Sequence, residues 1–392
     1  MDPLFTLTTG PVDIYPEVSR ALARPISYDY DPVFLHHYET VHGKVARALG
    51  TDADHTVILQ GEPVLGLEAA AASLISGQDT VLNLASGVYG AGFGEWAKRH
   101  CGAFHEMRVP FNEVIDPQAL SAVLDAHPEV SIVCLCHHDT PSGTVNPADA
   151  IGHIVANHGA LLIVDAVSSF GGMAITPAGC QADLFITGPN KCLGCPPGLS
   201  LLAISDRAWE KMKANPTAPR GSILSILDWE GAQRADQPFP FTPSVAEINA
   251  LDAALDRYLS EGPEAIWARH ALTAAACRAG IKAMGFTLWA ADESFASPTC
   301  TAVRTPEGID EQALRALIRE HHRVTLSSGR LETLGRLTRI GHMGPTAHPL
   351  YAVIALVAYG SGVATLTGRA VDIGAGAAAA MAIIDGASPL TP

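Results

Sequence analysis

The sequence predicts an α/β protein: a large domain with a mainly parallel, doubly wound sheet, followed by a smaller C-terminal α/β domain. Short apolar runs alternate with helix-like segments through the first half of the chain, which is typical of such a sheet. Two consecutive runs are followed by ionisable residues, Asp165 and Lys191. A chain of 392 residues is too long for one ordinary core. We expect an N-terminal arm (1–20), a large domain (21–259) and a small domain (260–392).

Strands of the large domain are predicted where apolar residues run between glycine, proline or polar breaks. They cover residues 56–60, 80–84, 105–110, 131–136, 161–165, 184–187 and 199–204. The helices between them have apolar residues at helical spacing or begin and end at suitable capping residues. They cover residues 32–50, 64–75, 117–126, 148–157, 206–214 and 245–258, and a further helix is entered from the glycine-rich loop after residue 85. Little periodicity precedes Pro32.

The C-terminal domain has the same mixture of apolar runs and amphipathic segments. Strands are expected at residues 299–303 and 337–340, and helices at 264–284, at 311–320, from Pro349 and from Ala375. The uncharged stretch from Ile340 to Gly368 is long enough to span a membrane. It contains two prolines and two histidines, and its apolar residues are mostly alanine and valine. We therefore predict a buried helix that begins near Pro349.

Composition excludes several classes of partner. The formal charge of −15 disfavours phosphate backbones and anionic lipid, so neither nucleic acid nor a membrane is expected as a partner. The N-terminus shows no signal-peptide pattern, and the protein is expected to be cytoplasmic with its eight scattered cysteines reduced. Cys192 and Cys195 have the spacing of a metal or redox pair, but no second pair lies at a suitable distance. No metal site is predicted.

Asp165 and Lys191 together suit a pyridoxal-type ring. Ligands of open α/β sheets bind at the carboxyl ends of the strands, where both residues are expected. The lysine would form a Schiff base, and the carboxylate would pair with the protonated ring nitrogen. A buried salt bridge between the two, or a solvated lysine in a loop, is the structural alternative, and spacing alone does not decide between them.

Several sequence blocks carry a resemblance to a known family. VDAVSSFGG and GPNKCLG resemble the fold type I pyridoxal-phosphate enzymes, in the alanine–glyoxylate/serine–pyruvate aminotransferase branch. Within that branch the chain is most similar to the pyridoxamine–pyruvate aminotransferases, in the blocks GEPVLGLEAAAASLIS, NLASGVYG, CHHDTPSGT, FPFTPSVAEIN and LTRIGHMGPTA. These blocks occur in one order over nearly the whole chain.

The resemblance implies roles for further residues. Tyr89 falls where the family stacks an aromatic ring on the pyridine face, and Thr140 where a hydroxyl lies near the ring O3′. Phe241 and Thr242 match a motif that reaches across a dimer interface toward the cofactor of the neighbouring subunit. Without the resemblance, Tyr89 would be a packing residue, and Phe241 and Thr242 part of a proline-rich loop.

The turn at Glu62 is unusual for a phosphate site. A strand, a glycine turn and a helix N-terminus usually bind phosphate through free backbone N–H groups. Here Glu62 places a carboxylate where the anion would lie, and Pro63 removes one N–H donor. We expect this turn to disfavour a phosphate and to accept the neutral hydroxymethyl group of pyridoxal. Glu62 could also be only a helix cap, and the two roles are compatible.

Two arginines are candidates for binding the substrate carboxylate. Arginine grips a carboxylate with two coplanar N–H groups. The resemblance assigns this role to Arg339 of the LTRIGHMG block, assisted by Arg330. Arg330 could instead pair with a local acid such as Glu332.

Together these features predict an aminotransferase that interconverts pyridoxamine and pyruvate with pyridoxal and L-alanine, in vitamin B6 degradation. Lys191 is the expected catalytic residue, and pyridoxal is a substrate, so no permanently bound cofactor is expected. The alternatives are a conventional pyridoxal-phosphate aminotransferase acting on alanine or serine with glyoxylate or pyruvate, and a non-catalytic vitamin B6 carrier. The resemblance implies a homodimer-based oligomer, with a tetramer favoured.

Overall fold

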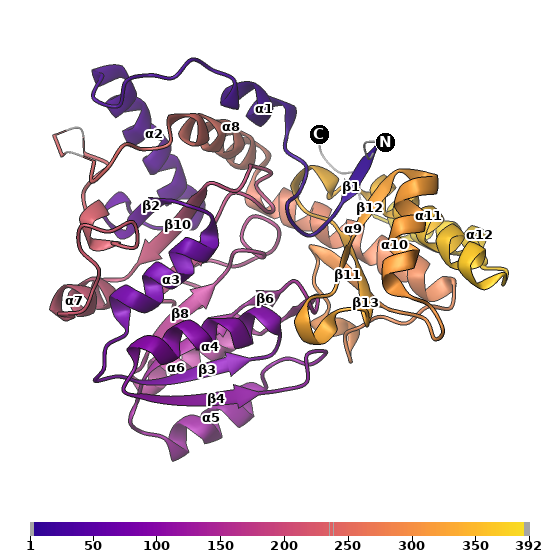
Figure 1. Cartoon of the computed structure of the whole chain (residues 1–392), viewed down its shortest axis with the longest axis horizontal. Coiled ribbons are helices and arrows are strands. Elements are labelled where there is room, and N and C mark those ends of the chain that lie inside the picture. The colour runs from indigo at the N-terminus through magenta and orange to yellow at the C-terminus, as the bar shows by residue number, and fades with distance from the viewer. Residues whose placement is uncertain (1–3, 235, 238, 388–392) are drawn as a thin grey trace.

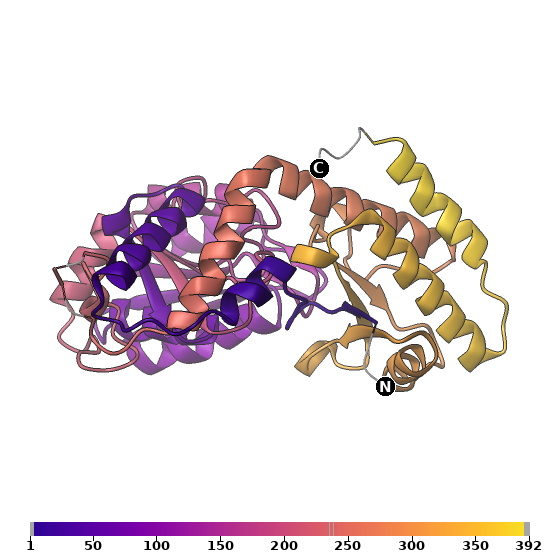
Figure 2. The same cartoon turned by 90° about the horizontal axis from the view of Figure 1, so that it is seen from above.

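We describe a computed structural model of the chain, which covers residues 4–234, 236–237 and 239–387. Figure 1 shows two lobes, a large one coloured indigo to pink and a small one coloured orange to yellow. Seen from above, the two lobes lie side by side along the longest axis (Figure 2).

The large lobe is built on a mixed sheet of seven strands. In spatial order they are β2 (Thr56–Gln60), β10 (Leu199–Ile204), β9 (Leu184–Thr187), β8 (Leu161–Asp165), β5 (Val130–Cys136), β3 (Thr80–Ala85) and β4 (Ala103–Arg108). The strands from β9 to β4 are parallel, and β10 runs antiparallel to both of its neighbours. The prediction of a mainly parallel, doubly wound sheet is confirmed.

Helices cover both faces of this sheet. They are α2 (Pro32–Leu49), α3 (Pro63–Leu74), α4 (Val88–His100), α5 (Pro117–Ala126), α6 (Ala148–His158), α7 (Asp206–Ala214) and α8 (Val245–Glu261). In Figure 1, α3 and α4 lie in front of the sheet and α6 lies behind it. One continuous core from Tyr15 to Ile266 fills the lobe. After β5, the short strands β6 (His138–Asp139) and β7 (Thr144–Val145) form a hairpin.

The small lobe has its own sheet and its own core. The sheet order is β1 (Phe5–Leu7), β12 (Val324–Ser328), β13 (Leu337–Gly341) and β11 (Cys300–Arg304). Its helices are α9 (Pro263–Ala283), α10 (Glu311–His322), α11 (Pro349–Thr367) and α12 (Ile373–Asp385). Short 3-10 turns span Ala53–His55, Leu227–Trp229, Glu293–Phe295, Leu331–Thr333 and Gly344–Thr346. Strand β12 was not predicted.

The N-terminal segment is more regular than its sequence indicated. β1 pairs in parallel with β12, and α1 (Pro16–Leu22) follows it, so the expectation of little structure before Pro32 is wrong. Both elements are too short to show a periodic pattern, and their burial depends on distant parts of the chain. Leu7 belongs to the core of the small lobe, whereas Tyr15 belongs to that of the large lobe. The domain limits at residues 20 and 259 stay a prediction.

Helix α11 is long and apolar enough to cross a membrane by composition. In the structure it packs against α9, α10 and α12, and 44% of its most apolar window is buried. The prediction of a buried helix beginning near Pro349 is confirmed, and α11 serves as a core helix of the small lobe.

Candidate active site

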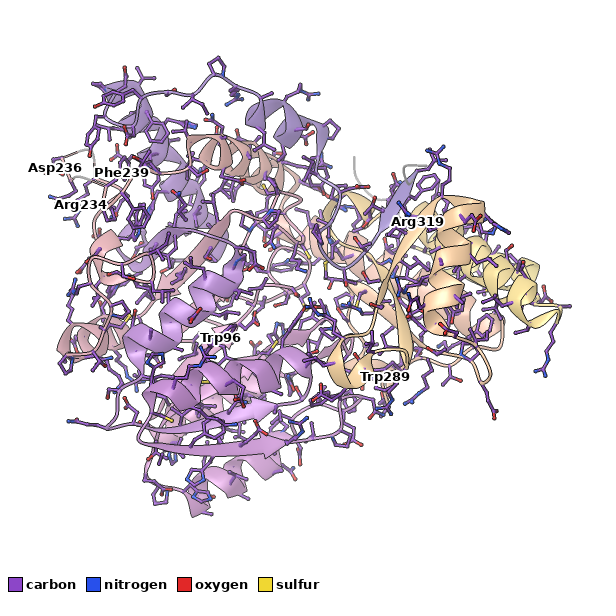
Figure 3. All side chains as sticks on the ribbon, in the orientation of Figure 1. Trp96, Arg234, Asp236, Phe239, Trp289 and Arg319 are labelled. Atoms are coloured by element: carbon purple, nitrogen blue, oxygen red, sulfur yellow. The ribbon has the colours of Figure 1, made fainter. Side chains whose placement is uncertain are left out.

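The carboxyl ends of β8 and β9 border a cavity of about 310 Å³. Asp165 is the last residue of β8, and Lys191 lies in the turn that follows β9. Much of the remaining wall comes from α3 and α4, including Trp96, which extends from α4 (Figure 3). The lining residues are Glu62, Pro63, Val64, Leu67, Tyr89, Gly92, Trp96, Asp165, Val167, Ser168, Lys191 and Arg330.

Lys191 is held against the N-terminal segment. Its Nζ donates a hydrogen bond of 2.6 Å to the carbonyl oxygen of Thr9. A side chain at position 10 would overlap the Lys191 amine, so this close approach requires Gly10. Burial lowers the pKa of the Lys191 ammonium to about 8, and Arg339 adds to this effect, while Glu62 and Asp165 partly offset it. The amine is therefore available in its neutral, nucleophilic form near pH 8.

Asp165 is a buried acid at the carboxyl end of β8. Only 8% of the residue is exposed, and its Oδ1 accepts a hydrogen bond of 2.9 Å from the N–H of Val167. Burial raises the pKa of its carboxyl to about 6, although hydrogen bonds from Val167 and Cys136 lower it. Such a group gains from a cationic partner, and a protonated ring nitrogen would supply one.

Tyr89 lies in the first turn of α4, and its backbone N–H is held by a hydrogen bond to Asp139. The carboxylate of Asp139, at the end of β6, accepts hydrogen bonds from the N–H groups of Tyr89 (2.6 Å) and Gly90 (3.2 Å). A Cβ at position 87 would overlap that carboxylate, which explains the glycine there. Tyr89 is half-buried on the cavity wall, on the same face of α4 as Gly92 and Trp96. The strand β6 thus orients an aromatic ring toward the cavity.

Thr140, Phe241 and Thr242 do not line the cavity of the single chain. Thr140 is buried, and its hydroxyl has no hydrogen-bond partner among the described residues. Phe241 packs edge-on against Trp229 with ring centroids 5.2 Å apart, and Thr242 is exposed. The role of Thr140 near the ring O3′ stays a prediction, and so does the role of Phe241 and Thr242, which needs a second subunit.

Glu62 is the N-cap of α3. Its Oε2 accepts a hydrogen bond of 3.0 Å from the N–H of Val64, and Pro63 occupies the first helical position. The positive end of the helix dipole is therefore already compensated by an acid of the chain itself. Glu62 is exposed and borders the cavity.

The two arginines differ in their surroundings. Arg339 on β13 is 5% exposed, and its Nε donates to the carbonyl oxygen of Ser328 at 2.7 Å. Within the described chain, no carboxylate lies within 4.0 Å of its guanidinium. Arg330 is exposed on the cavity rim, and its Nη1 donates to the Tyr89 hydroxyl at 3.3 Å. The alternative pairing of Arg330 is not seen, because Glu332 pairs with Arg108 at 3.2 Å.

Residues 17–340 match the family model of the class-V aminotransferases. The chain belongs to this family. It is 64% identical, over 98% of its length and 97% of that protein, to the pyridoxamine–pyruvate transaminase of Mesorhizobium japonicum. The crystal structure of pyridoxamine–pyruvate aminotransferase from Mesorhizobium loti matches with a TM-score of 0.97 at 63% identity, over 98% of each chain. The (S)-ureidoglycine–glyoxylate transaminase of Bacillus subtilis is 28% identical over 87% of this chain and 86% of that protein.

Class-V aminotransferases typically use pyridoxal phosphate. The residues around this cavity fit the ring of that cofactor but not its phosphate. The ring end fits, because Asp165, Lys191 and Tyr89 border one cavity with a buried acid, an amine and an aromatic face. The turn between β2 and α3 does not fit a phosphate dianion. It presents the carboxylate of Glu62, lacks one N–H donor at Pro63, and its first-turn N–H at Val64 is already bonded.

Some residues of this aminotransferase site were not found from the sequence. Thr9 and Gly10 contact Lys191 although they lie far away in the chain. Trp96 lies seven residues after Tyr89 on the same face of α4, and that helical spacing is the signal that could have identified it.

Proposed function

We propose that this class-V aminotransferase interconverts pyridoxamine and pyruvate with pyridoxal and L-alanine. The observation that carries the proposal is the Glu62 carboxylate, which borders the cavity and caps α3 where an anion would otherwise bind. The high identity to a relative named pyridoxamine–pyruvate transaminase supports the same substrates. Pyridoxal would enter as a substrate, so no permanently bound cofactor is proposed.

Four residues would hold the pyridoxal ring, and three of them line the cavity. Lys191 would bind the aldehyde carbon covalently, and Asp165 would pair with the ring nitrogen. Tyr89 would stack on the ring face, and Thr140 would bond the ring oxygen. When bound, pyridoxal supplies an electron-accepting ring that stabilises negative charge at the carbon losing a proton.

The protein would supply the proton transfer and hold the acid substrate. After the amino group of L-alanine has replaced it on the aldehyde carbon, the freed Lys191 amine, with its pKa lowered to about 8, would take a proton from Cα of alanine and deliver it to C4′ of the vitamin. Water would then hydrolyse the remaining C=N bond and release pyruvate and pyridoxamine. Arg339 would bind the carboxylate of alanine or pyruvate, because its buried guanidinium has no carboxylate partner in the described chain. Arg330, which contacts the Tyr89 hydroxyl at the rim, would assist.

Glu62 would explain why the vitamin can leave. Its Oε2 bonds the N–H of Val64, which leaves Oε1 to accept a hydrogen bond from the neutral hydroxymethyl group of pyridoxal. A phosphate at the same place would meet a like charge in a partly dry site. Pyridoxamine, formed when pyridoxal takes the amino group of alanine, then leaves as a product. The complete reaction of this enzyme therefore corresponds to one half-reaction of an ordinary aminotransferase.

The oligomer and the cellular setting are part of the same proposal. Phe241 and Thr242 lie outside the cavity of one chain, and a homodimer-based assembly, with a tetramer favoured, would bring them to the cavity of a neighbouring subunit. All eight cysteines are free, which agrees with a cytoplasmic enzyme of vitamin B6 degradation.

The test is an absorbance titration of purified protein with pyridoxal and, separately, with pyridoxal phosphate. We expect tighter binding of pyridoxal, and Glu62→Gln should shift the ratio of the two dissociation constants at least about tenfold toward the phosphate. Glu68→Gln is the matched control, because Glu68 lies on the same helix outside the cavity lining. An unchanged ratio in Glu62→Gln would refute the charge argument.

Two other outcomes would identify the alternatives. A yellow cofactor that survives dialysis would indicate a conventional pyridoxal-phosphate aminotransferase. A spectral change with pyridoxal that L-alanine does not reverse would indicate a vitamin B6 carrier.

A further inference from the structure

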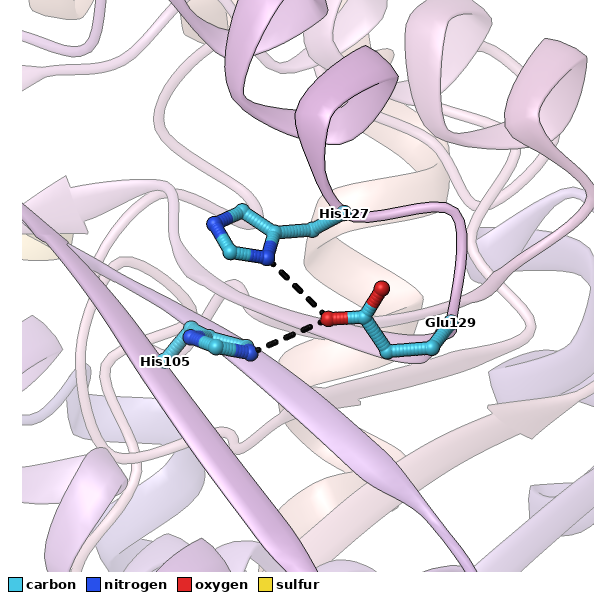
Figure 4. Close-up of side chains that lie close together, drawn as sticks. All are labelled: His105, His127 and Glu129. Carbon is cyan, nitrogen blue, oxygen red and sulfur yellow. Dashed lines mark hydrogen bonds and ion pairs between the residues drawn. The ribbon is translucent and has the colours of Figure 1, made fainter.

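Two histidines and a glutamate converge on the outer edge of the large sheet, away from the Lys191 cavity. His105 lies on β4, His127 is the C-cap of α5, and Glu129 lies one residue before β5. Figure 4 shows both rings directed toward the same oxygen of Glu129. His127 Nδ1 lies 3.0 Å and His105 Nε2 lies 3.3 Å from Glu129 Oε1.

The arrangement has the dimensions of a metal ligand set. One ligand atom from each residue lies within 4.8 Å of the other two. In a tetrahedral site with ligands about 2.0–2.1 Å from zinc, neighbouring ligand atoms are about 3.3 Å apart, close to the two distances observed. The rings lie with centroids 4.2 Å apart at 36°, so small side-chain rotations would bring both nitrogens onto one ion.

The backbone around the three residues is already ordered. The N–H of His127 donates to Leu124, and the N–H of Val130 donates to His127, which closes the turn between α5 and β5. Among the described residues, β4 pairs only with β3 and is an edge strand of the sheet. The three side chains are half-buried or exposed, so an ion could reach them from solvent.

We propose that His105, His127 and Glu129 bind a divalent transition-metal ion of the zinc class, with water completing its coordination. Imidazole and carboxylate are ligands that zinc accepts, and three protein ligands leave one position open. The ion would tie the edge strand β4 to the turn before β5. The site is a stabilising one, since none of its residues lines the cavity that contains Lys191. The sequence did not reveal it, because its ligands come from separate elements without a motif.

The test compares zinc binding by metal-stripped protein and its variants in equilibrium dialysis. His105→Gln and His127→Gln each remove one ligand and keep a polar side chain of similar size. His36→Gln is the matched control, because His36 also faces a glutamate, with Nδ1 3.7 Å from Glu39 Oε2, but belongs to no three-residue ligand group in the described chain.

We expect the wild type and His36→Gln to bind about one zinc ion per chain at this site. Binding should weaken at least about tenfold in His105→Gln and in His127→Gln, since even changes behind the ligands cost that much. Zinc should raise the melting temperature of the wild type and of His36→Gln, but not that of His105→Gln or His127→Gln. Equal zinc binding by wild type and His105→Gln would overturn the proposal, and so would no binding by either.

Replacing zinc with cobalt distinguishes binding at this site from binding by cysteine thiolates. Cobalt bound by nitrogen and oxygen should give visible bands without a thiolate charge-transfer band, and His105→Gln should lose them. A thiolate band that persists in His105→Gln would overturn the proposal. None of these measurements uses the transaminase activity, so the outcome is independent of the proposed function.

Discussion

Two helices begin at the wall of the same cavity, and in each a carboxylate bonds N–H groups of the first turn. At α4 the acid is Asp139, which comes from a separate strand, is fully buried and bonds the N–H groups of Tyr89 and Gly90. At α3 the acid is Glu62, which is exposed, belongs to the helix cap itself and bonds the N–H of Val64.

The comparison teaches that one interaction can serve structure or ligand selection, depending on burial. Burial raises the pKa of the Asp139 carboxyl, and hydrogen bonds from the N–H groups of Gly90 and Tyr89 to its Oδ2 counter that effect, so this oxygen serves to hold the start of α4. Glu62 borders the cavity and keeps an oxygen for a ligand. We therefore expect changes at Asp139 to reduce stability, and changes at Glu62 to alter which vitamin form binds.

The largest effect is expected at Lys191, the group that both helix ends surround. Lys191→Ala should lower kcat for pyridoxal formation from pyridoxamine and pyruvate by at least about 10³-fold, because it removes both the covalent anchor and the proton carrier. The absorbance of pyridoxal measures the rate, and circular dichroism checks the fold. Activity within tenfold of the wild type would contradict the assignment of Lys191.

A smaller effect is expected at Arg339, which would attract the substrate carboxylate, whereas Glu62 would repel a phosphate. Arg339→Gln should raise KM for pyruvate about 30-fold or more, because a buried, charge-assisted carboxylate contact is lost. Glu62→Gln should leave KM for pyruvate within about twofold. If both variants raise KM for pyruvate equally, Arg339 and Glu62 do not have separate tasks.

The third prediction contrasts the two helix caps directly by denaturant unfolding. Asp139→Ala should lower the free energy of unfolding by about 2–3 kcal/mol, because it leaves two N–H groups without their buried acceptor. Glu62→Ala should cost about 0.5–1 kcal/mol, since water can replace an exposed cap. Equal losses would remove the distinction between the two acids.

Local pattern predicted most of the large lobe, because its strands are short apolar runs between clear breaks. The run that ends at Asp165 became β8, and the run before Lys191 became β9, as expected. The contacts of Lys191 with Thr9 and Gly10 could not be predicted, since they depend on how β1 joins a sheet formed by the far end of the chain. Contacts between segments that lie far apart in the chain could not be predicted from local sequence patterns.

The resemblance identified candidate residues but not how they are held. Thr140 lies outside the cavity lining of one chain, a placement that no local pattern contains. The Asp139 carboxylate accepts a hydrogen bond from the N–H of Tyr89, a contact between separate elements that the resemblance did not supply.

The smallest effect concerns pH and connects Glu62 with Lys191. The pKa of Lys191 is lowered to about 8, so its neutral fraction, and with it the rate of pyridoxal capture, should rise as pH increases through about 8. Glu62 raises this pKa by favouring the ammonium form, so Glu62→Gln should move the midpoint downward. Stopped-flow absorbance measures the profile, with Glu68→Gln as the control that leaves it in place. An upward or absent shift would show that the Glu62 charge does not act on Lys191, and its role would then be limited to capping α3.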